Sequence, residues 1–266
     1  NDDSSELMKI NKAAGLHPVK VHPELFELIS LGKWHSCQPG SHLNIAIGPL
    51  IQTWRIGFSD AKLPLPEEIR PLLDIINPNA ILLSEENQSV FLKEKGMKID
   101  LGALAKGYIA DRIADFLKAE KVTSALINLG GNVLTFGPAL HNPDHKWRIG
   151  IQNPKETRNT NLMVLAIRDK SVVTSGIYER TFEIDGKTYH HIFDSQTGYP
   201  VSSDLASLTI ISSLSVDGEI WTTRLFGSSL EHIFQEVSSQ AELEAIIVDK
   251  DNHCFQTGGI YKMRIS

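Results

Sequence analysis

Cysteine is nearly absent from this chain, which has two such residues among 266. Cys37 and Cys254 lie far apart and lack the spacing of a metal site, so we expect incidental or buried thiols rather than a disulfide. No apolar run is long enough to span a bilayer. No long basic run is present and the formal net charge is −6, which argues against nucleic acid as a partner. The composition, 41% hydrophobic and 22% charged, is typical of a globular protein with a sizeable core.

Two common motifs are absent as well. The chain has no G-x-S-x-G nucleophile elbow, which argues against a serine hydrolase. Gly130-Gly131 lacks the G-x-G-x-x-G spacing and the following helix of a dinucleotide fingerprint. We therefore interpret this pair as a tight turn at a strand end.

Hydrophobic periodicity predicts an α+β fold. Helices are expected over residues 5–14, 22–37, 65–76, 104–120, 218–228 and 229–240. Strands are expected in residues 80–102 (three strands), 125–137, 147–154, 161–176, 180–194 and 206–214, and in a final hairpin over 241–258. Many strands follow one another with few helices between them. This order favours a single large domain over residues 1–266, with a mainly antiparallel sheet flanked by helices.

The helix expected over residues 104–120 has the clearest pattern and an unusual start. Its apolar residues share one stripe: Leu104, Ala105, Tyr108, Ile109, Ile113, Phe116 and Leu117. Asp100, just before it, either caps the helix or faces a ligand. The small residues Gly102 and Ala103 would let an anion such as phosphate approach the free N–H groups of the helix start. Because the helix dipole disfavours a cation there, we expect Lys106 to reach an anionic group or an acid.

Two further segments mix hydroxyl, histidine and acidic side chains. The sequence Thr174-Ser175-Gly176 suits either a loop that hydrogen-bonds an anion or an ordinary turn. His191 and Asp194 could form a general-base pair. The alternative is that His191 is an ordinary strand histidine with its hydrogen bonds satisfied, beside the turn that contains Thr-Gly-Tyr-Pro.

The segment SVDGEIWTTR carries two acids and two threonines. Glu219 and Thr223 are four residues apart and would share one face of a helix. A carboxylate and a hydroxyl are hard oxygen ligands suited to Mg²⁺. The alternative is an ordinary helix start, with Asp217 as the cap and Glu219 in the first turn.

Taken together, these segments resemble the ApbE family, the FAD:protein FMN transferases. The matching pieces are IDLGALAKGYIADRIADFL, ALINLGGNVLTFG, WRIGIQNP, VVTSGIYERTFEIDGKTYHHIFDSQTGYPV and the segment ending in EIWTTRLFG. GPLIQTW is similar to the family's segment near the flavin, and SSELMKINKA to its early segment. The resemblance covers nearly the whole chain, and the combination is specific although each short motif is not.

The resemblance implies a Mg²⁺-dependent transferase with FAD as its substrate. It would cleave the diphosphate of FAD, release AMP and attach FMN to a Thr or Ser hydroxyl of an acceptor flavoprotein subunit with a D-x-x-[ST]-[GS]-A-[ST]-type motif. Because that hydroxyl belongs to the acceptor, this chain needs no nucleophile of its own. Mg²⁺ and the start of the helix would neutralise the charge of the diphosphate.

The resemblance also implies roles for particular residues. Metal ligands fall on Ala103, through its backbone carbonyl, on Glu219 and on Thr223, with Asp217 as a competing carboxylate. Flavin or phosphate contacts fall on Asp100, Lys106, Trp54, Ile192, Phe193, Thr174, Ser175 and Gly176. His191 and Asp194 are the catalytic candidates, and His191 or a nearby acid would take the proton.

Three departures from the family pattern keep alternatives open. The family usually has Asp where this chain has Glu219, it often has D-P-x-T-G-x-P where this chain has Asp194 to Pro200, and its opening strand is missing here. The alternatives are a metal-dependent FAD pyrophosphatase and a non-catalytic flavin-binding protein. The chain opens without Met, so any signal peptide or anchoring cysteine lies upstream. We expect an extracytoplasmic lipoprotein anchored to the cell membrane, with a cytoplasmic location as the alternative.

Overall fold

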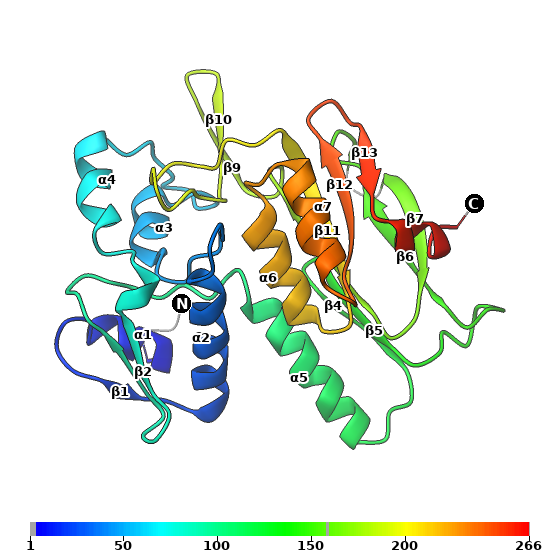
Figure 1. Ribbon diagram of the computed structural model, residues 1–266, viewed down its shortest axis with the longest axis horizontal. Helices are drawn as coiled ribbons and strands as arrows, with labels where there is room; N and C mark the ends of the chain where they lie inside the picture. The colour runs from blue at the N-terminus through cyan, green and yellow to red at the C-terminus, as the bar shows by residue number, and fades with distance from the viewer. Residues whose placement is uncertain (1–3, 158–159, 266) are drawn as a thin grey trace. The chain divides into compact units, whose positions relative to one another are not determined.

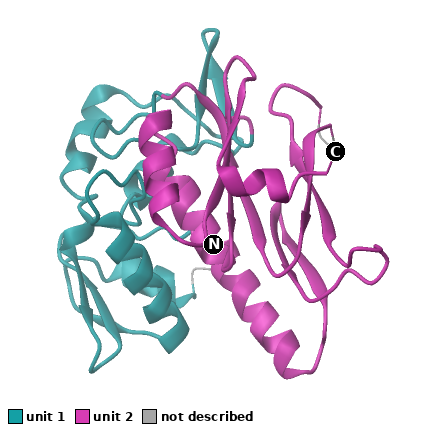
Figure 2. Cartoon of the chain, turned by 45° about the vertical axis from the view of Figure 1, so that its right-hand side comes forward, with its two compact units in different colours: residues 1–103, 179–202 teal, residues 104–178, 203–266 magenta. Residues whose placement is uncertain are grey.

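The computed structural model describes residues 4–157 and 160–265, which divide into two compact units (Figures 1 and 2). Unit 1 comprises residues 1–103 and 179–202, and unit 2 comprises residues 104–178 and 203–266. Each unit therefore joins two segments that are distant in the sequence. The predicted single domain over residues 1–266 stays a prediction.

Unit 1 combines short helices with two small antiparallel sheets. Its helical elements are α1 (Glu6–Lys12), α2 (Pro23–Ser36), α3 (Gly48–Trp54), α4 (Pro66–Leu73) and the 3-10 turn η1 (Pro78–Ala80). One sheet has the order β1-β3-β2, formed by Val19–Lys20, Ser89–Leu92 and Ile81–Ser84. The other is the hairpin of β9 (Thr181–Ile184) and β10 (Lys187–His190). Its turn is Asp185-Gly186, a pair typical of two-residue hairpin turns, with φ angles of 50° and 70°.

Two parts of unit 1 differ from the sequence prediction. Helix α3 was not predicted, because the apolar alternation before Gly48 hides a helix start that has Pro49 in its first turn. The third strand expected in residues 80–102 is wrong, since Lys98 makes only an isolated bridge with Ile47. The side chain of Asn11 explains the difference, because it bonds both the N–H and the carbonyl of Ile99, at 2.8 and 3.0 Å.

Unit 2 is built on a six-stranded sheet in which every pairing of the described strands is antiparallel, as predicted (Figure 1). The order is β13-β12-β11-β8-β5-β4, from Cys254–Gln256, Glu244–Asp249, Leu205–Ser212, Ser171–Gly176, Asn132–Phe136 and Ala125–Leu129. The hairpin of β6 (Trp147–Gln152) and β7 (Asn161–Ile167) packs on one face through a cluster that includes Leu165, Val172 and Ile211. The 3-10 turn η2 (Gly258–Lys262) closes this side through Ile260.

Helices α5 (Ala105–Ala119), α6 (Ser215–Leu225) and α7 (Leu230–Ser239) complete unit 2. Helices α5 and α6 pack on each other and on the sheet face opposite the β6–β7 hairpin, where Ala110 and Ala114 meet Leu134 and Phe136. Helix α7 begins after Ser229, whose hydroxyl accepts a hydrogen bond from the N–H of His232. The core of unit 2 therefore has a helical layer, a sheet and a hairpin layer.

The apolar stripe predicted for α5 is buried only in part. Leu104 and Tyr108 are buried, and Ile113 and Leu117 pack against the core. Ile109 and Phe116 are 48% and 63% exposed. Besides Tyr108, the buried residues of α5 are small or polar: Gly107, Ala110, Asp111 and Ala114. A Cβ at Gly107 would lie 2.5 Å from the carbonyl oxygen of Ser215, so this glycine allows α5 and α6 to approach closely.

Candidate functional site

The centre of the candidate site is the carboxylate of Glu219, on α6. This residue is 4% exposed. Its Oε1 forms an ion pair with the Nζ of Lys106, at 3.0 Å, and accepts a hydrogen bond from the Nδ2 of Asn132, at 2.8 Å. Oε2 accepts no hydrogen bond from any residue in the described ranges. A buried carboxylate with a half-exposed cation on one oxygen and an open second oxygen is suited to binding a further cation.

The expectation for Lys106 is confirmed by this ion pair. Lys106 lies in the first turn of α5 and reaches the acid Glu219 across the α5–α6 contact. The side chain of Lys106 is 45% exposed. It can therefore neutralise Glu219 while its ammonium stays partly hydrated.

The N-terminus of α6 is capped from another helix. Asp111, on α5, accepts hydrogen bonds from the backbone N–H groups of Ser215 and Val216, at 2.8 and 2.9 Å. Burial raises the pKa of Asp111, and the two N–H groups oppose this shift only in part. The bonds fix the α6 start against α5 and thereby set the position of Glu219 one turn further on.

Asp217 is not the helix cap that the sequence suggested. Helix α6 begins at Ser215, three residues earlier than predicted, with Leu214 at the cap position. Asp217 is half-buried, and burial, followed by the negative charges of Asp111 and Glu242, raises its pKa. The charges that act on Asp217 are therefore those of other acids, whereas Glu219 forms an ion pair with Lys106.

The positions on α6 also separate the two candidate metal carboxylates. With 3.6 residues per turn, Glu219 and Thr223 lie about 40° apart around the helix, whereas Asp217 and Glu219 lie about 160° apart. Thr223 is half-buried, and its side-chain hydroxyl makes no hydrogen bond within the described chain. By contrast, the neighbouring Thr222 hydroxyl donates a hydrogen bond to the backbone carbonyl of Glu219, at 3.0 Å. Glu219, and not Asp217, shares a face with the open Thr223 hydroxyl.

Asn132 is a site residue that the sequence reasoning missed. Gly130 and Gly131 form the two-residue turn between β4 and β5, with φ angles of 61° and 91°, which confirms the predicted tight turn. Asn132 closes this turn opposite Leu129 and is 1% exposed. A polar residue directly after a Gly-Gly turn was the available signal, but its partner, Glu219, lies 87 residues away.

In unit 1 the predicted segment around residue 194 forms a closed turn. The carboxylate of Asp194 accepts hydrogen bonds from Gln196 N, at 2.8 Å, and from Thr197 Oγ1, at 3.1 Å. The Nδ1 of His191 lies 3.3 Å from the carbonyl oxygen of Arg180. The carboxylate of Asp194 therefore stabilises its own turn and is not hydrogen-bonded to His191.

Trp54 packs against this turn and is hydrogen-bonded to it. It is fully buried, and its Nε1 donates to the carbonyl of Gly198 at 2.9 Å. Its ring contacts those of Tyr189, Phe193 and Tyr199, at centroid distances of 5.4, 5.7 and 5.6 Å. Trp54 is thus a core residue of unit 1 in this structure, and its predicted flavin contact stays a prediction.

Five other predicted ligand residues are buried or lie at the end of a strand. Ile192 and Phe193 are 9% and 5% exposed. Thr174, Ser175 and Gly176 lie in β8 and pair with β11, so the predicted loop or turn there is wrong. The hydroxyls of Thr174 and Thr209 are 2.8 Å apart across these strands.

Asp100 does not cap a helix, because α5 begins at Ala105. Its Oδ1 accepts from Gly102 N at 2.8 Å and closes a local turn. Asp100 and Ala103 belong to unit 1, whereas Glu219 and Thr223 belong to unit 2. The predicted ligand set thus draws on both units, and that grouping stays a prediction.

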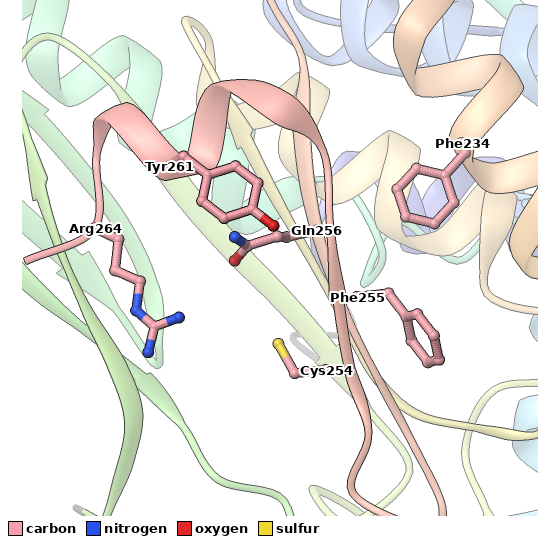
Figure 3. A pocket seen from close by; sticks show the side chains of 6 residues that line it. All are labelled: Phe234, Cys254, Phe255, Gln256, Tyr261 and Arg264. Atoms are coloured by element: carbon pink, nitrogen blue, oxygen red, sulfur yellow. The ribbon is translucent and has the colours of Figure 1, made fainter. Parts of the chain in front are cut away.

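A separate cavity of about 380 Å³ lies near the end of the chain (Figure 3). Its lining residues come from α7, β13 and the C-terminal turn: Phe234, Cys254, Phe255, Gln256, Tyr261 and Arg264. None of them is a predicted site residue. Cys254 is exposed, and partial burial of its thiol raises the pKa of that thiol. Both cysteines are free, as expected.

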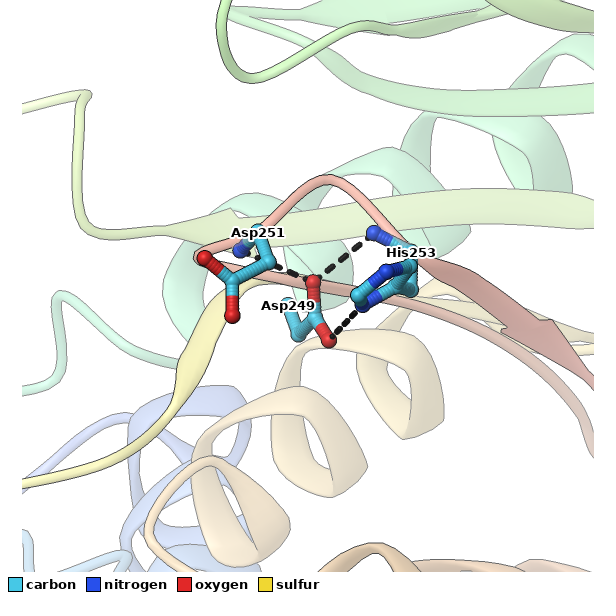
Figure 4. A group of neighbouring side chains, drawn as sticks. All are labelled: Asp249, Asp251 and His253. Atoms are coloured by element: carbon cyan, nitrogen blue, oxygen red, sulfur yellow. Dashed lines mark hydrogen bonds and ion pairs between the residues drawn. The ribbon is translucent and has the colours of Figure 1, made fainter.

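An exposed group of possible metal ligands lies in the β12–β13 turn (Figure 4). Asp249 Oδ1 accepts from the backbone N–H groups of Asp251 and His253, and Oδ2 lies 2.9 Å from His253 Nδ1. These bonds are those of a tight turn, in which Asn252 has a φ of 72°. The hydrogen bonds of this turn explain why the three side chains lie together, and no bound metal ion is needed to explain it.

Comparison with known proteins gives one consistent result. The profile of the ApbE family matches residues 1–247. Over 251 residues the chain is 46% identical to the FAD:protein FMN transferase of Klebsiella pneumoniae (strain 342), covering 94% of this chain and 77% of that protein. It is 33% identical to the protein of the same name from Treponema pallidum (strain Nichols), covering 98% of this chain and 75% of that protein. The ApbE protein of Thermotoga maritima, a crystal structure, matches with a TM-score of 0.90 at 26% identity, covering 100% of this chain and 85% of that chain.

The class that the fold and these relatives define is that of the flavin transferases. The chain belongs to the ApbE family. The predicted family, the α+β fold and the prediction of a transferase are thereby confirmed. Within the described residues, no helix has both the length and the apolar character needed to cross a membrane. The extracytoplasmic location and the lipid anchor stay predictions.

Proposed function

We propose that this protein transfers FMN from FAD to a Thr or Ser hydroxyl of an acceptor flavoprotein, with Mg²⁺ as the cofactor and AMP as the leaving group. The observation that carries the proposal is the buried Glu219 carboxylate, in which Oε1 is held by Asn132 and Lys106 and Oε2 accepts no hydrogen bond from the described residues. Glu219 also lies on the helix face that carries Thr223. Family membership supplies the substrate and the acceptor class.

The residues of α6 fit a divalent cation. A carboxylate and a hydroxyl on one helix face are hard oxygen donors of the kind that Mg²⁺ takes, and such sites leave positions for water and phosphate oxygens. Glu219 is preferred over Asp217 because it shares the face of Thr223 and has a cationic neighbour. The backbone carbonyl of Ala103 stays a predicted third ligand.

The reaction needs charge neutralisation, alignment and removal of one proton. The acceptor hydroxyl oxygen bonds to the phosphorus of the FMN half of FAD, the bond from that phosphorus to the bridging oxygen breaks, and AMP leaves with the bridging oxygen. When bound, Mg²⁺ polarises the phosphoryl oxygens. Lys106 adds a positive charge beside Glu219, and His191 is the proposed acceptor of the hydroxyl proton.

The direct test is covalent flavinylation. The protein is incubated with FAD, Mg²⁺ and an acceptor subunit that has the D-x-x-[ST]-[GS]-A-[ST]-type motif, and the acceptor's mass is measured. We expect a gain of one FMN unit, lost with EDTA and lost when the motif hydroxyl residue of the acceptor is changed to Ala. Free FMN and AMP without acceptor labelling would indicate a pyrophosphatase instead, and stoichiometric FAD binding without AMP would indicate a carrier.

The ligand role of Thr223 is tested by an isosteric substitution. Thr223→Val removes the open hydroxyl, so we expect the Mg²⁺ concentration for half-maximal transfer to rise about tenfold or more while FAD affinity changes little. Thr222→Val is the matched control, because its hydroxyl bonds the Glu219 carbonyl within the helix. An equal Mg²⁺ response in the two variants would remove Thr223 from the ligand set.

A further inference from the structure

We infer that Asn132 is a positioning residue for the metal-binding carboxylate: its side-chain amide holds Glu219 Oε1 so that Oε2 faces the cation. The inference rests on the proposed function, because it assigns Glu219 to the metal. Asn132 itself touches neither FAD nor the cation in this assignment. It acts through the orientation of the neighbouring carboxylate, as outer partners of metal ligands do.

The orientation of the Asn132 amide is fixed by its other partner. Ser215 Oγ donates to Asn132 Oδ1 at 2.6 Å. Because Oδ1 accepts this bond, the Nδ2 group is the side directed at Glu219, 2.8 Å away. A flipped amide would place two acceptors, Oδ1 and Oε1, against each other.

Asn132 and its partner Ser215 each lie at the first residue of a secondary-structure element of unit 2. Asn132 is the first residue of β5 and is fixed by the Gly130-Gly131 turn. Ser215 is the first residue of α6 and is fixed by Asp111. One amide therefore links the sheet both to the start of α6 and to the carboxylate one turn later on the same helix.

Lys106 alone would not give the same control. Its ammonium also bonds Glu219 Oε1, but the side chain is 45% exposed and flexible. Asn132 is 1% exposed and has a short side chain, so it restricts the carboxylate more tightly. The restraint from Asn132 matters more for the glutamate at position 219 than it would for an aspartate, because the glutamate side chain has one more rotatable bond.

The test measures cation binding without catalysis. Mn²⁺ is titrated into the whole protein, with and without FAD, and free Mn²⁺ is read by electron paramagnetic resonance. We expect Asn132→Ala to weaken Mn²⁺ binding by roughly 10- to 100-fold, the range found when outer partners of metal ligands are removed. FAD affinity in the absence of metal should stay at the wild-type level.

Ser171→Ala is the matched control. Ser171 is fully buried and its hydroxyl contacts Ser215 Oγ at 3.0 Å, but it does not touch Glu219. Ser171→Ala should bind Mn²⁺ as the wild type does. Equal Mn²⁺ affinity in Asn132→Ala and the wild type would overturn the positioning role, and so would an equal loss in Ser171→Ala.

A second variant covers the case in which Asn132→Ala does not fold. Ser215→Ala leaves the Asn132 amide in place but frees it to rotate, so we expect a smaller loss of Mn²⁺ affinity than for Asn132→Ala, roughly threefold to tenfold. Ser215→Ala with wild-type affinity would overturn the inference. If the wild type binds Mn²⁺ tightly and both Asn132→Ala and Ser215→Ala bind it equally well, only the positioning role is rejected. A wild-type protein that binds no Mn²⁺ rejects the metal site of the proposed function as well.

Discussion

Glu219→Gln should lower FMN transfer by about 100-fold or more. The substitution keeps the size of the side chain but removes the anionic charge that would hold Mg²⁺, and a metal ion contributes several kcal/mol to the stabilisation of a phosphoryl transition state. The amide still fills the buried space beside Lys106 and Asn132. We therefore expect a folded protein whose residual rate no longer responds to added Mg²⁺, measured by acceptor flavinylation across a Mg²⁺ series.

Asp217→Asn is the control for this experiment. It removes a carboxylate from the same helix, two residues from Glu219 and about 160° around the helix from it. We expect it to retain the Mg²⁺ response. The opposite result, with Asp217→Asn insensitive to Mg²⁺ and Glu219→Gln responsive, would assign the metal to Asp217.

Asp111→Ala should destabilise the protein by roughly 2–3 kcal/mol. The change leaves the N–H groups of Ser215 and Val216 unpaired at a buried helix start, and each unsatisfied group costs about 1–3 kcal/mol, offset in part by removal of a buried charge. Urea unfolding followed by circular dichroism measures the loss. Asp115→Ala, on the exposed side of the same helix, should change stability by less than about 0.5 kcal/mol. Equal losses would show that the cap is not the cause.

The pH dependence of stability gives an independent check of Asp111. Burial raises its pKa above the ordinary value of 3.8, so in the interval between the unfolded and folded pKa values the folded state binds more protons than the unfolded state. The contribution of Asp111 is therefore fully present below the unfolded pKa and is lost as pH rises through the folded pKa. The free energy of unfolding of the wild type, minus that of Asp111→Asn, should fall as pH rises from acid toward neutrality. A difference that rises instead would mean that the two N–H groups outweigh burial.

Much of the secondary structure followed from local sequence. Periodicity located α2, α4, α5 and α7 and most of the strands, because each has a repeat or a cap within its own residues. The pairs Gly130-Gly131 and Asp185-Gly186 predicted their turns, since both positions in each turn need positive φ angles. The resemblance carried by several short motifs indicated the family.

The start of α6 and the site partners did not follow from local sequence. Asp217 looked like a cap, but Asp111, more than a hundred residues earlier, satisfies the N–H groups of α6. The apolar stripe of α5 predicted that Ile109 and Phe116 are buried, yet both are exposed. Gly107 lies in the buried face instead, because its missing Cβ allows contact with α6.

The sequence by itself determined the family, the antiparallel α+β fold and the candidate acid and hydroxyl at Glu219 and Thr223. Tertiary structure alone decided that Glu219 is held by Lys106 and Asn132, since these contacts join residues 113 and 87 positions apart. The physical reason is that the orientation of a buried carboxylate is set by the donors packed around it. Those donors come from a helix and a strand whose meeting depends on the whole fold of unit 2.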